Sequence, residues 1–202
     1  MLRFIIFDVM GVVFTVGDDV EELLIPYIRA LKLGIDAQEI RNKYLEASLA
    51  RITAQEFWAQ LGFREENITK LERAYLEKSF TLDAEFRPCV EALRKRYGIA
   101  LLSNDIAEWS RFLRVHYNLE PLLDAAFISG DLGVRKPDPQ IYRIALATLG
   151  AKPHECVFID DDPVRVAAAA ELGFRSILFN RADRDYGGEQ IESFRQIERL
   201  LT

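Results

Sequence analysis

Short runs of hydrophobic residues alternate along this chain with longer segments in which hydrophobic residues recur every three or four positions. The first run, residues 3–8, is almost entirely apolar and rich in Ile and Phe, which is typical of a strand buried on both faces of a parallel sheet. Four further runs of this kind follow after residue 98. The predicted strands are residues 3–8, 99–103, 125–129, 156–160 and 176–180.

Segments with helical periodicity lie between these strands. Their apolar residues recur three and four positions apart, a spacing that places them on one face of a helix. The predicted helices of this part of the chain are residues 90–97, 107–117, 139–150, 163–173 and 189–201. Strands that alternate with helices predict an α/β fold. We therefore expect a doubly wound (Rossmann-like) parallel sheet of five or six strands, with residues 3–8 as its central strand.

A wholly helical stretch interrupts the alternation between the first two strands. Its periodic segments predict roughly four helices, at residues 20–33, 37–50, 54–61 and 68–80. We expect this stretch, residues 18–82, to form a helical cap domain inserted after the first strand, and residues 1–17 and 83–202 to form the α/β core domain. The hinges between the two domains would lie near residues 15–17 and 82–87.

Local signals mark the ends of these helices. Asp36 and Thr53 each precede a helical segment and are expected N-caps, and Glu56, three residues after Thr53, completes a capping box. Gly34 and Gly62 are expected to end helices, because glycine tolerates the left-handed backbone that often follows a helix.

Composition narrows the class of protein. Half of the 202 residues are hydrophobic, enough to bury a full core, and the net charge is −6 with a pI near 5.1. We expect no nucleic-acid or membrane partner, since either would require a basic face. The two cysteines, Cys89 and Cys156, match no metal-binding spacing and fit a reducing compartment. The short apolar run before Asp8 is no signal peptide, so we expect a cytoplasmic protein, monomeric or homodimeric.

Reactive side chains follow four of the predicted strands. In an open α/β sheet, ligands bind in the crevice outside the carboxyl ends of the strands. The residues that reach this edge are Asp8 after the first strand, Ser103 and Asn104 at the second, Lys136 after the third, and Asp160, Asp161 and Asp162 at the fourth. Carboxylates, a hydroxyl and a lysine at one edge predict a site that handles phosphate.

Asp8 is the candidate nucleophile. Aspartate forms covalent intermediates with phosphoryl groups, and the flexible Gly11 nearby would allow a phosphorus atom to approach the carboxylate in line. The structural alternative is an aspartate that caps the next turn.

The second and third motifs offer groups that could bind the phosphate itself. The Ser103 hydroxyl and the backbone N–H groups near Asn104 could bind the oxygens that are not transferred, although Ser-Asn is also a common turn or helix cap. Lys136, in a loop that Pro137 and Pro139 restrict, could neutralise phosphate and restrain the nucleophile, and Arg135 beside it could do the same. The alternative for Lys136 is a solvated loop lysine.

The run of Asp160, Asp161 and Asp162 is the most specific single feature. Adjacent carboxylates repel one another unless a cation lies among them, and Mg²⁺ binds a few oxygen ligands while it keeps several waters. Asp8 and Asp161 could supply two ligands and the backbone carbonyl near Met10 a third, with Asp160 or Asp162 in support. The alternative is an N-cap cluster for the following helix, a role that one of the three is expected to fill.

In order and spacing, these motifs resemble those of the haloacid dehalogenase superfamily over essentially the whole chain. FIIFDVMGVVF is similar to the first motif, LLSND to the second, the lysine of GVRKPDPQIY to the third and FIDDDP to the fourth. The helical stretch after the first motif is similar to the small (C1-type) cap of the subgroup that acts on small molecules.

The resemblance implies a hydrolase with particular residue roles. Asp8 would be the nucleophile, Asp161 the main magnesium ligand, Ser103 a phosphate ligand and Lys136 the positive clamp. The implied reaction is Mg²⁺-dependent hydrolysis of a small phosphorylated metabolite through a phospho-aspartate at Asp8.

Two positions depart from the family pattern. Phosphatases of this superfamily carry a second aspartate two residues after the nucleophile, which protonates the leaving alcohol and then activates water. Here that position is Met10, which can do neither, and such acid–base help is worth ~10²–10⁴-fold in rate. Arg165 stands in the fourth motif where the family often has Asn or Asp.

Three functions therefore remain open. The first is a Mg²⁺-dependent phosphatase that obtains proton transfer from substrate or cap groups. The second is a dehalogenase or phosphonate hydrolase that uses Asp8; such enzymes also lack the second aspartate, but the metal-independent dehalogenases tend to lack the acidic cluster that this chain keeps. The third is a non-catalytic relative that binds a ligand or a partner. Receiver domains have a similar set of residues but no long helical insertion after the first strand.

Overall fold

The computed structural model describes residues 1–32 and 34–201, and its sheet has six strands, each parallel to its neighbours, in the order β3-β2-β1-β4-β5-β6. The strands are β1 (Phe4–Phe7), β2 (Gly98–Ser103), β3 (Ala125–Ile128), β4 (Cys156–Asp160), β5 (Arg175–Phe179) and β6 (Gln190–Ile191). The predicted parallel α/β sheet is confirmed, with β1 between β2 and β4 at its centre. Strands are added on both sides of β1, which makes the fold doubly wound.

Helices and turns connect these strands. The elements after the helical stretch are α5 (Phe86–Leu93), α6 (Ala107–His116), η2 (Glu120–Leu122), α7 (Ser129–Leu132), α8 (Pro139–Leu149), η3 (Pro153–Glu155), α9 (Pro163–Glu171) and α10 (Phe194–Leu201). Helix α5 begins at Phe86 rather than at the predicted residue 90. It can do so because Pro88 falls in the first turn, where a missing N–H costs no hydrogen bond.

The prediction of one helix over residues 189–201 is wrong at its start. Gln190–Ile191 form strand β6 beside β5, with Asn180 N donating to Ile191 O at 2.7 Å, and α10 begins only at Phe194. Hydrogen bonds to the neighbouring strand determine the conformation of this segment. The spacing of its apolar residues, which is helical, does not reveal those hydrogen bonds.

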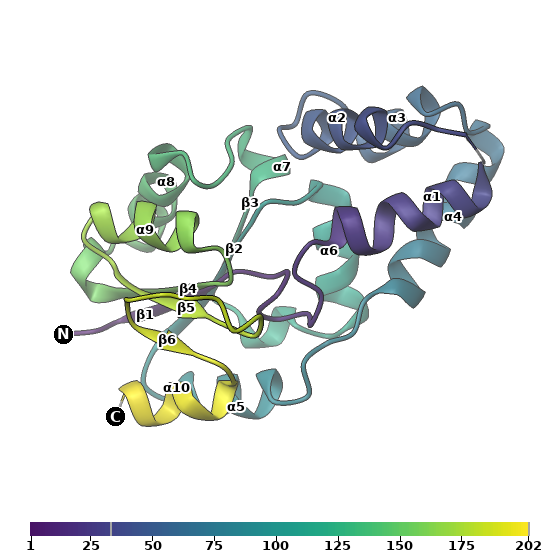
Figure 1. Cartoon of the computed structure of the whole chain (residues 1–202). Helices are drawn as coiled ribbons and strands as arrows, with labels where there is room; N and C mark the ends of the chain where they lie inside the picture. Colours follow the sequence, from purple (N-terminus) through teal and green to yellow (C-terminus); the bar gives the residue numbers. More distant parts are fainter. Residues whose placement is uncertain (33, 202) are drawn as a thin grey trace.

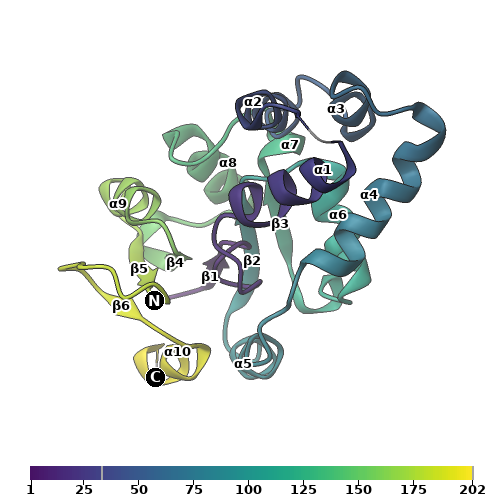
Figure 2. The ribbon, with the colours of Figure 1, turned by 45° about the vertical axis from the view of Figure 1, so that its right-hand side comes forward.

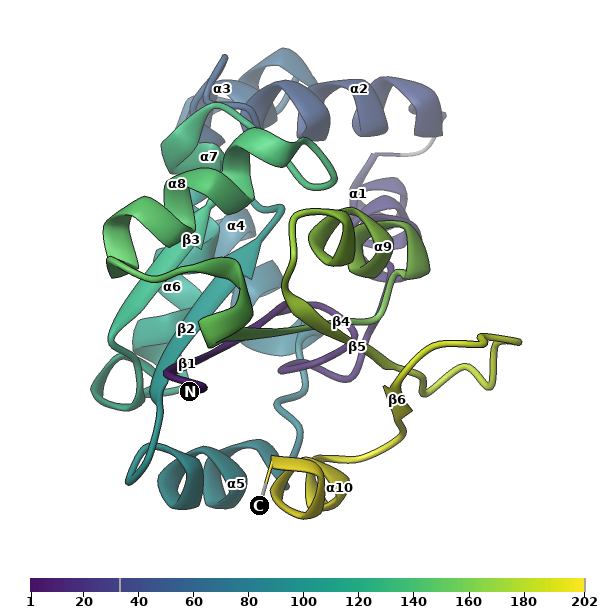
Figure 3. The ribbon, with the colours of Figure 1, turned by 90° about the vertical axis from the view of Figure 1, so that its left-hand side faces the viewer.

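The sheet is buried on both faces, as its continuous apolar strands predict. On one face Phe7 contacts Phe86 of α5 and Phe194 of α10, with ring centroids 5.9 and 6.0 Å apart, and these two helices lie side by side (Figures 1 and 2). On the opposite face Phe158 contacts Tyr142 of α8 at 5.4 Å, and α9 lies beside α8. Figure 3 shows the two helix pairs on opposite sides of the sheet.

The predicted helical stretch is present between β1 and α5. Its elements are the π-helical turn η1 (Val20–Leu24), α1 (Ile25–Leu31), α2 (Ala37–Ala47), α3 (Ala54–Gln60) and α4 (Glu65–Ser79). Leu33, the last residue of the first predicted helix, lies outside the described residues. In the part of the chain that the structure describes, no helix combines the length and the apolar character needed to cross a membrane.

The helix ends predicted at Asp36, Thr53 and Gly62 are confirmed in their geometry, whereas α1 already ends at Leu31, before Gly34. The side chain of Asp36 accepts a hydrogen bond from Gln38 N at 3.1 Å at the start of α2. Thr53 and Glu56 form both hydrogen bonds of a capping box before α3. Gly62, which follows α3, has a φ of 81°, the left-handed conformation expected there.

An aromatic cluster joins the helical stretch to α6. Trp109 of α6 contacts Trp58 of α3 and Tyr75 of α4, with ring centroids 6.0 and 5.4 Å apart. Both indole N–H groups donate to Glu72 Oε2, at 2.7 and 2.9 Å. Helices α1–α4 lie beyond the end of the sheet that carries the site residues (Figure 1). The division into cap and core domains at residues 18 and 82 stays a prediction, because apolar packing runs continuously from one to the other.

Replacing Trp109 by Ala should lower the free energy of unfolding by about 3–5 kcal/mol, since it empties the centre of this cluster. Chemical denaturation with urea measures the change. Val115→Ala, on the same helix and 62% exposed, is the control and should change stability by less than about 0.5 kcal/mol. A loss below about 1 kcal/mol for Trp109→Ala would show that the helical stretch does not depend on this contact.

Candidate active site

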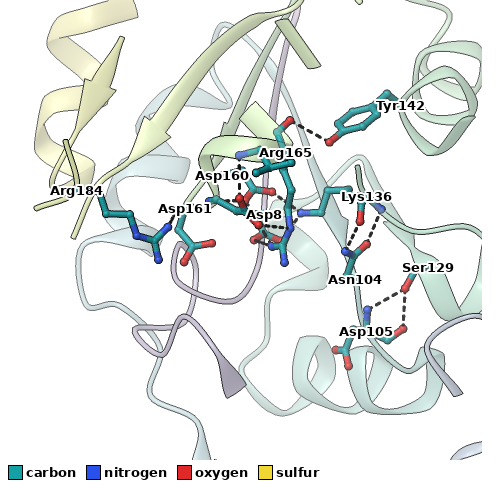
Figure 4. A network of polar contacts seen from close by, with 12 residues as sticks. Asp8, Asn104, Asp105, Ser129, Lys136, Tyr142, Asp160, Asp161, Arg165 and Arg184 are labelled. Carbon is teal, nitrogen blue, oxygen red and sulfur yellow. Dashed lines mark hydrogen bonds and ion pairs between the residues drawn. The ribbon is translucent and has the colours of Figure 1, made fainter. Parts of the chain in front are cut away.

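A buried lysine joins two of the predicted site carboxylates. Lys136 Nζ lies 2.6 Å from Asp8 Oδ1 and 2.6 Å from Asp160 Oδ2, and all three side chains are buried (Figure 4). Asp8 follows β1 and Asp160 ends the neighbouring strand β4, whereas Lys136 comes from the loop between α7 and α8. Close opposite charges offset part of the cost of removing these groups from water.

Asn104, at the end of β2, holds the loop that carries Lys136. Asn104 Oδ1 accepts a hydrogen bond from Lys136 N at 2.8 Å, and Asn104 Nδ2 donates to Lys136 O at 2.9 Å. The loop ends at α8, where the side chain of Asp138 accepts from Gln140 N and Pro139 occupies the first helical position. The Asn104 side chain is therefore committed to positioning Lys136, and its predicted contact with substrate stays a prediction.

Arg165, which the sequence marked only as a departure from the family pattern, lies among the site carboxylates. Its Nη1 is 3.4 Å from Asp8 Oδ2 and 3.6 Å from Asp160 Oδ1, and its Nε is 3.3 Å from Asp162 Oδ2. Arg165 sits in the first turn of α9, which begins where Asp162 accepts a hydrogen bond from Val164 N at 2.9 Å. One of the three aspartates was expected to be the N-cap of this helix, and that residue is Asp162.

Asp161 is packed closely against the loop after β1. A Cβ atom at Gly11 would lie 2.3 Å from Asp161 Oδ2, and the φ of Gly11 is 76°, so only glycine fits this position without strain. The main-chain oxygen of Asp161 accepts from Arg184 Nη1 at 2.7 Å. Among residues 1–32 and 34–201, its carboxylate has no hydrogen bond or ion pair. Burial, and then repulsion from Asp8 and Asp160, raises the pKa of Asp161 to about 7.

The protonation of Asp8 depends on two opposing effects. Burial, followed by repulsion from Asp160, raises the pKa of Asp8, and Lys136 and Arg165 offset only part of this rise. The two cations favour the carboxylate form of Asp8, which is the form that can act as a nucleophile, but the net pKa stays above its usual value.

The donor set suits a divalent cation. Asp8, Asp160 and Asp161 each offer an oxygen, and these oxygens lie within 4.8 Å of one another. Together with Asp162 they carry two more negative charges than Lys136 and Arg165 offset, and hard oxygen ligands are those that Mg²⁺ prefers. Arg165 opposes such binding, because its guanidinium already lies beside oxygens of Asp8 and Asp160.

Asp8, Asp161 and Arg165 face one cleft of about 280 Å³, whereas Asp160 and Lys136 are buried and do not line it. Ser103 and Asp161 line it from the edge of the sheet, Tyr44 of α2 and Asp19 line it from the helical stretch, and Met10 lines it from the loop after β1. The predicted nucleophile Asp8, the phosphate ligand Ser103 and the metal ligands Met10 and Asp161 are therefore brought to one cavity, and Asp160 lies beside Asp8 and Asp161 without lining it. Gly11 lies behind Asp161, in a neighbouring depression of about 240 Å³.

Two arginines add positive charge to the cleft. Arg135 donates to Ser48 Oγ and lies 5.9 Å from the ring centroid of Tyr44, and Arg184 donates to the main chain of Asp161. Neither guanidinium forms an ion pair within the described part of the chain. Both are therefore available to an anionic ligand. Arg135 lines the cleft, where it could neutralise phosphate as its place beside Lys136 in the sequence predicts.

Sequence reasoning missed Asp19 and Arg184. The pair Asp18–Asp19 precedes a helical segment and resembles an ordinary N-cap signal, and Arg184 lies in a polar loop after β5. Neither residue belongs to a motif with fixed spacing. Only the fold of the chain brings them to the cleft, so no local signal could have assigned them.

The family of the chain follows from comparison with known proteins. The model of the haloacid dehalogenase-like hydrolases matches residues 2–173. This chain belongs to that family, which confirms the resemblance found in its four motifs.

Curated relatives include both phosphatases and dehalogenases. The D-ribitol-5-phosphate phosphatase of Bacteroides thetaiotaomicron is 28% identical over 193 aligned positions, which cover 87% of this chain and 91% of the relative. The (S)-2-haloacid dehalogenase 1 of Pseudomonas sp. (strain CBS-3) is 26% identical over 226 aligned positions, covering 99% and 96%. For two other relatives the chain spans only 38% and 31% of their length.

Solved structures share the fold. A HAD family enzyme of Bacteroides thetaiotaomicron, in complex with magnesium and inorganic phosphate, matches with a TM-score of 0.72 at 21% identity, covering 93% of this chain and 98% of that chain. The family and the fold are thus shared with enzymes of different chemistry, and the reaction has to be argued from the site.

Replacing Lys136 by Met should lower the free energy of unfolding by about 3–5 kcal/mol at pH 8, because Asp8 and Asp160 lose the cation that they share. The loss should shrink as the pH falls toward 5. Burial raises the pKa of Asp8 and Lys136 opposes that rise, so without Lys136 the folded state binds a proton at Asp8 that the unfolded state, with a pKa near ~4, does not hold. Urea denaturation at several pH values measures both effects.

Lys152→Met, at an exposed lysine, is the matched control and should leave stability nearly unchanged. The assignment of Lys136 as the link between the two carboxylates is wrong if its loss costs less than about 1 kcal/mol, or if the cost grows as the pH falls.

Proposed function

We propose that this protein is a Mg²⁺-assisted phosphatase that hydrolyses a small phosphorylated metabolite in the cytoplasm, with Asp8 as the nucleophile. The observation that carries the proposal is the Asp161 carboxylate, which has no partner among the described residues and lies beside Asp8 and Asp160. A phosphoryl group bears negative charge and approaches a carboxylate only when cations offset the repulsion. The surplus of carboxylates in this site can bind a divalent cation, and that cation would offset the repulsion.

The residues of the cleft divide the reaction between them. Lys136 holds Asp8 Oδ1 at 2.6 Å, so Oδ2, at 3.4 Å from Arg165, is the less tightly held oxygen and the one that attacks phosphorus. The bond from phosphorus to the alcohol oxygen breaks, and water then hydrolyses the phospho-aspartate. The Ser103 hydroxyl and the Arg135 guanidinium are placed to bind the oxygens that are not transferred.

Mg²⁺ would be held by Asp8, Asp161 and Asp160. When bound, it would neutralise charge on the transferring phosphoryl group. The contact of Arg165 with Asp8 would have to give way, because both oxygens of Asp8 are otherwise occupied by cationic side chains.

A second candidate function is dehalogenation. It is favoured by Met10, an apolar side chain in the wall of the cleft, and by Arg165, which places a fixed cation beside Asp8 without a metal. Asp8 would displace halide from carbon and form an ester that water hydrolyses. This reaction leaves no task for the Asp161 carboxylate, and for that reason the phosphatase is the first choice.

The purified protein should release phosphate from phosphate monoesters when Mg²⁺ is present and release no halide from 2-haloacids. Asp8→Asn should abolish this activity, because an amide is a far poorer nucleophile than a carboxylate. Asp131→Asn, at an exposed aspartate of α7, is the matched control and should retain it. Asp8→Asn activity within about tenfold of wild type would reject the covalent role, and halide release would favour the second candidate.

Arg165→Asn should raise the affinity for Mg²⁺ by about tenfold or more. Two unit charges ~4 Å apart interact by ~4 kcal/mol at an effective dielectric constant of ~20, so removing the guanidinium removes strong repulsion of the ion. Isothermal titration calorimetry and the Mg²⁺-dependent rise in melting temperature measure the change. Arg143→Asn, on the surface of α8, should bind Mg²⁺ as the wild type does, and Asp161→Ala should not bind it. Equal affinities in wild type and Arg165→Asn would contradict the competition.

A further inference from the structure

The proposed phosphatase lacks a group for proton transfer at the position of Met10. An alcohol leaves phosphorus slowly as an alkoxide, and water attacks the phospho-aspartate slowly unless a base accepts its proton. The replacement must be another titratable side chain that reaches the cleft beside Asp8. This inference therefore rests on the proposed function.

Asp19 is such a side chain. It lies just before η1 and lines the same cleft as Asp8 and Met10. It is nevertheless only 7% exposed. A carboxyl that is largely shielded from bulk water and borders the cavity of the nucleophile can exchange a proton with a ligand in that cavity rather than with solvent.

The carboxyl of Asp19 has no structural task that accounts for it. Asp19 occupies the N-cap position of η1, yet its side chain forms no capping hydrogen bond, and Glu21 N donates instead to Asp18 Oδ1 at 3.0 Å. Among the described residues, the buried Asp19 Oδ2 has no hydrogen-bond partner. Burying a carboxylate with an unpaired oxygen is costly, so this position favours the protonated acid.

The net effect of the groups around Asp19 also favours the acid. Burial, then the Asp18 carboxylate, raises the pKa of Asp19 to about 7 with a smaller contribution from Asp8, while a hydrogen bond from the backbone N–H of Asp19 and the charge of Arg135 lower it. A pKa near the working pH lets one group act as acid in one step and as base in the next.

Three further polar groups on other elements interact electrostatically with Asp19. These are Tyr44 of α2, Tyr75 of α4 and Asp105 after β2, each of which has its own pKa raised by burial and then by Asp19. Tyr75 and Asp105 do not line the cleft, and burial keeps the hydroxyls of both tyrosines neutral. Of Asp19, Tyr44, Tyr75 and Asp105, Asp19 is thus the residue that both borders the cavity and can offer it an acidic proton.

We propose that Asp19 is the general acid and base of this enzyme, in the role that Met10 cannot fill. As the Asp8 oxygen forms its bond to phosphorus and the bond to the alcohol oxygen breaks, the Asp19 carboxyl gives its proton to that alcohol oxygen. The Asp19 carboxylate then takes a proton from water while the water oxygen forms a bond to phosphorus and the Asp8–phosphorus bond breaks. Phosphate leaves, and Asp19 is again protonated.

The test compares a poor and a good leaving group in Asp19→Asn with Mg²⁺ present. Turnover of a simple alkyl phosphate such as glycerol phosphate should fall by ~10²–10⁴-fold, because its alcohol needs the proton. With 4-nitrophenyl phosphate, whose leaving group needs none, the variant should still release about one nitrophenol per enzyme in a rapid burst and then stall as phospho-aspartate. Glu21→Gln, at an exposed residue of η1, is the control and should behave as wild type.

A purely structural role for Asp19 would not separate the two substrates. The proposal is overturned if Asp19→Asn hydrolyses the alkyl phosphate within about tenfold of wild type, or if it loses the nitrophenol burst together with alkyl turnover. If the wild type releases alcohol from neither substrate, the phosphatase function itself is wrong, and the role of Asp19 is rejected with it.

Met10→Asp in the otherwise wild-type chain gives a second, independent measurement. If Asp19 already supplies the proton, this substitution should raise alkyl phosphate turnover by less than about tenfold. If the site has no acid, the gain should approach the ~10²–10⁴-fold of acid–base catalysis, and the proposal fails even where Asp19→Asn does not fold. In the double variant Asp19→Asn, Met10→Asp, turnover of the alkyl phosphate should return.

Discussion

The contact of Lys136 with Asp8 and Asp160 is the interaction on which the site depends. Three buried charged groups from distant parts of the chain meet at 2.6 Å, and their opposite charges offset part of the cost of burying them. The sheet order makes the meeting possible, because β1 and β4 are neighbours and present their carboxyl ends side by side. Asn104 then fixes the loop that brings the ammonium to them.

The charged residues around this contact include one feature that the chain shares with its family and one that differs from the family pattern. The acidic cluster at the end of β4 is kept and carries surplus negative charge, as a divalent cation requires. Arg165 offsets part of that surplus from within the cluster. The two departures from the family pattern, Met10 and Arg165, therefore concern the two tasks that surround the nucleophile, which are proton transfer and cation binding.

The helical stretch completes the cleft and is anchored by packing rather than by charge. Trp109 and its aromatic neighbours hold α3 and α4 against α6, and this places Tyr44 and the residues before η1 over the edge of the sheet. Asp19 borders this cleft and is buried, although it lies at the N-cap of η1. Its Oδ2 has no partner among the described residues, and a buried carboxyl of this kind favours its protonated form more than one in solvent does.

The sequence by itself determined the five long strands, most helices, their caps and the four strand ends that carry Asp8, Ser103, Lys136 and the acidic run, because each depends on residues close together in the chain. The same reasoning failed at Gln190–Ile191, where pairing with β5 overrides helical spacing. Only the tertiary structure decided that Arg165 lies beside Asp8, and that Asp19 and Arg184 border the cleft. Those contacts depend on how distant segments pack, and the burial and charge that give these side chains their chemistry exist only once the chain is folded.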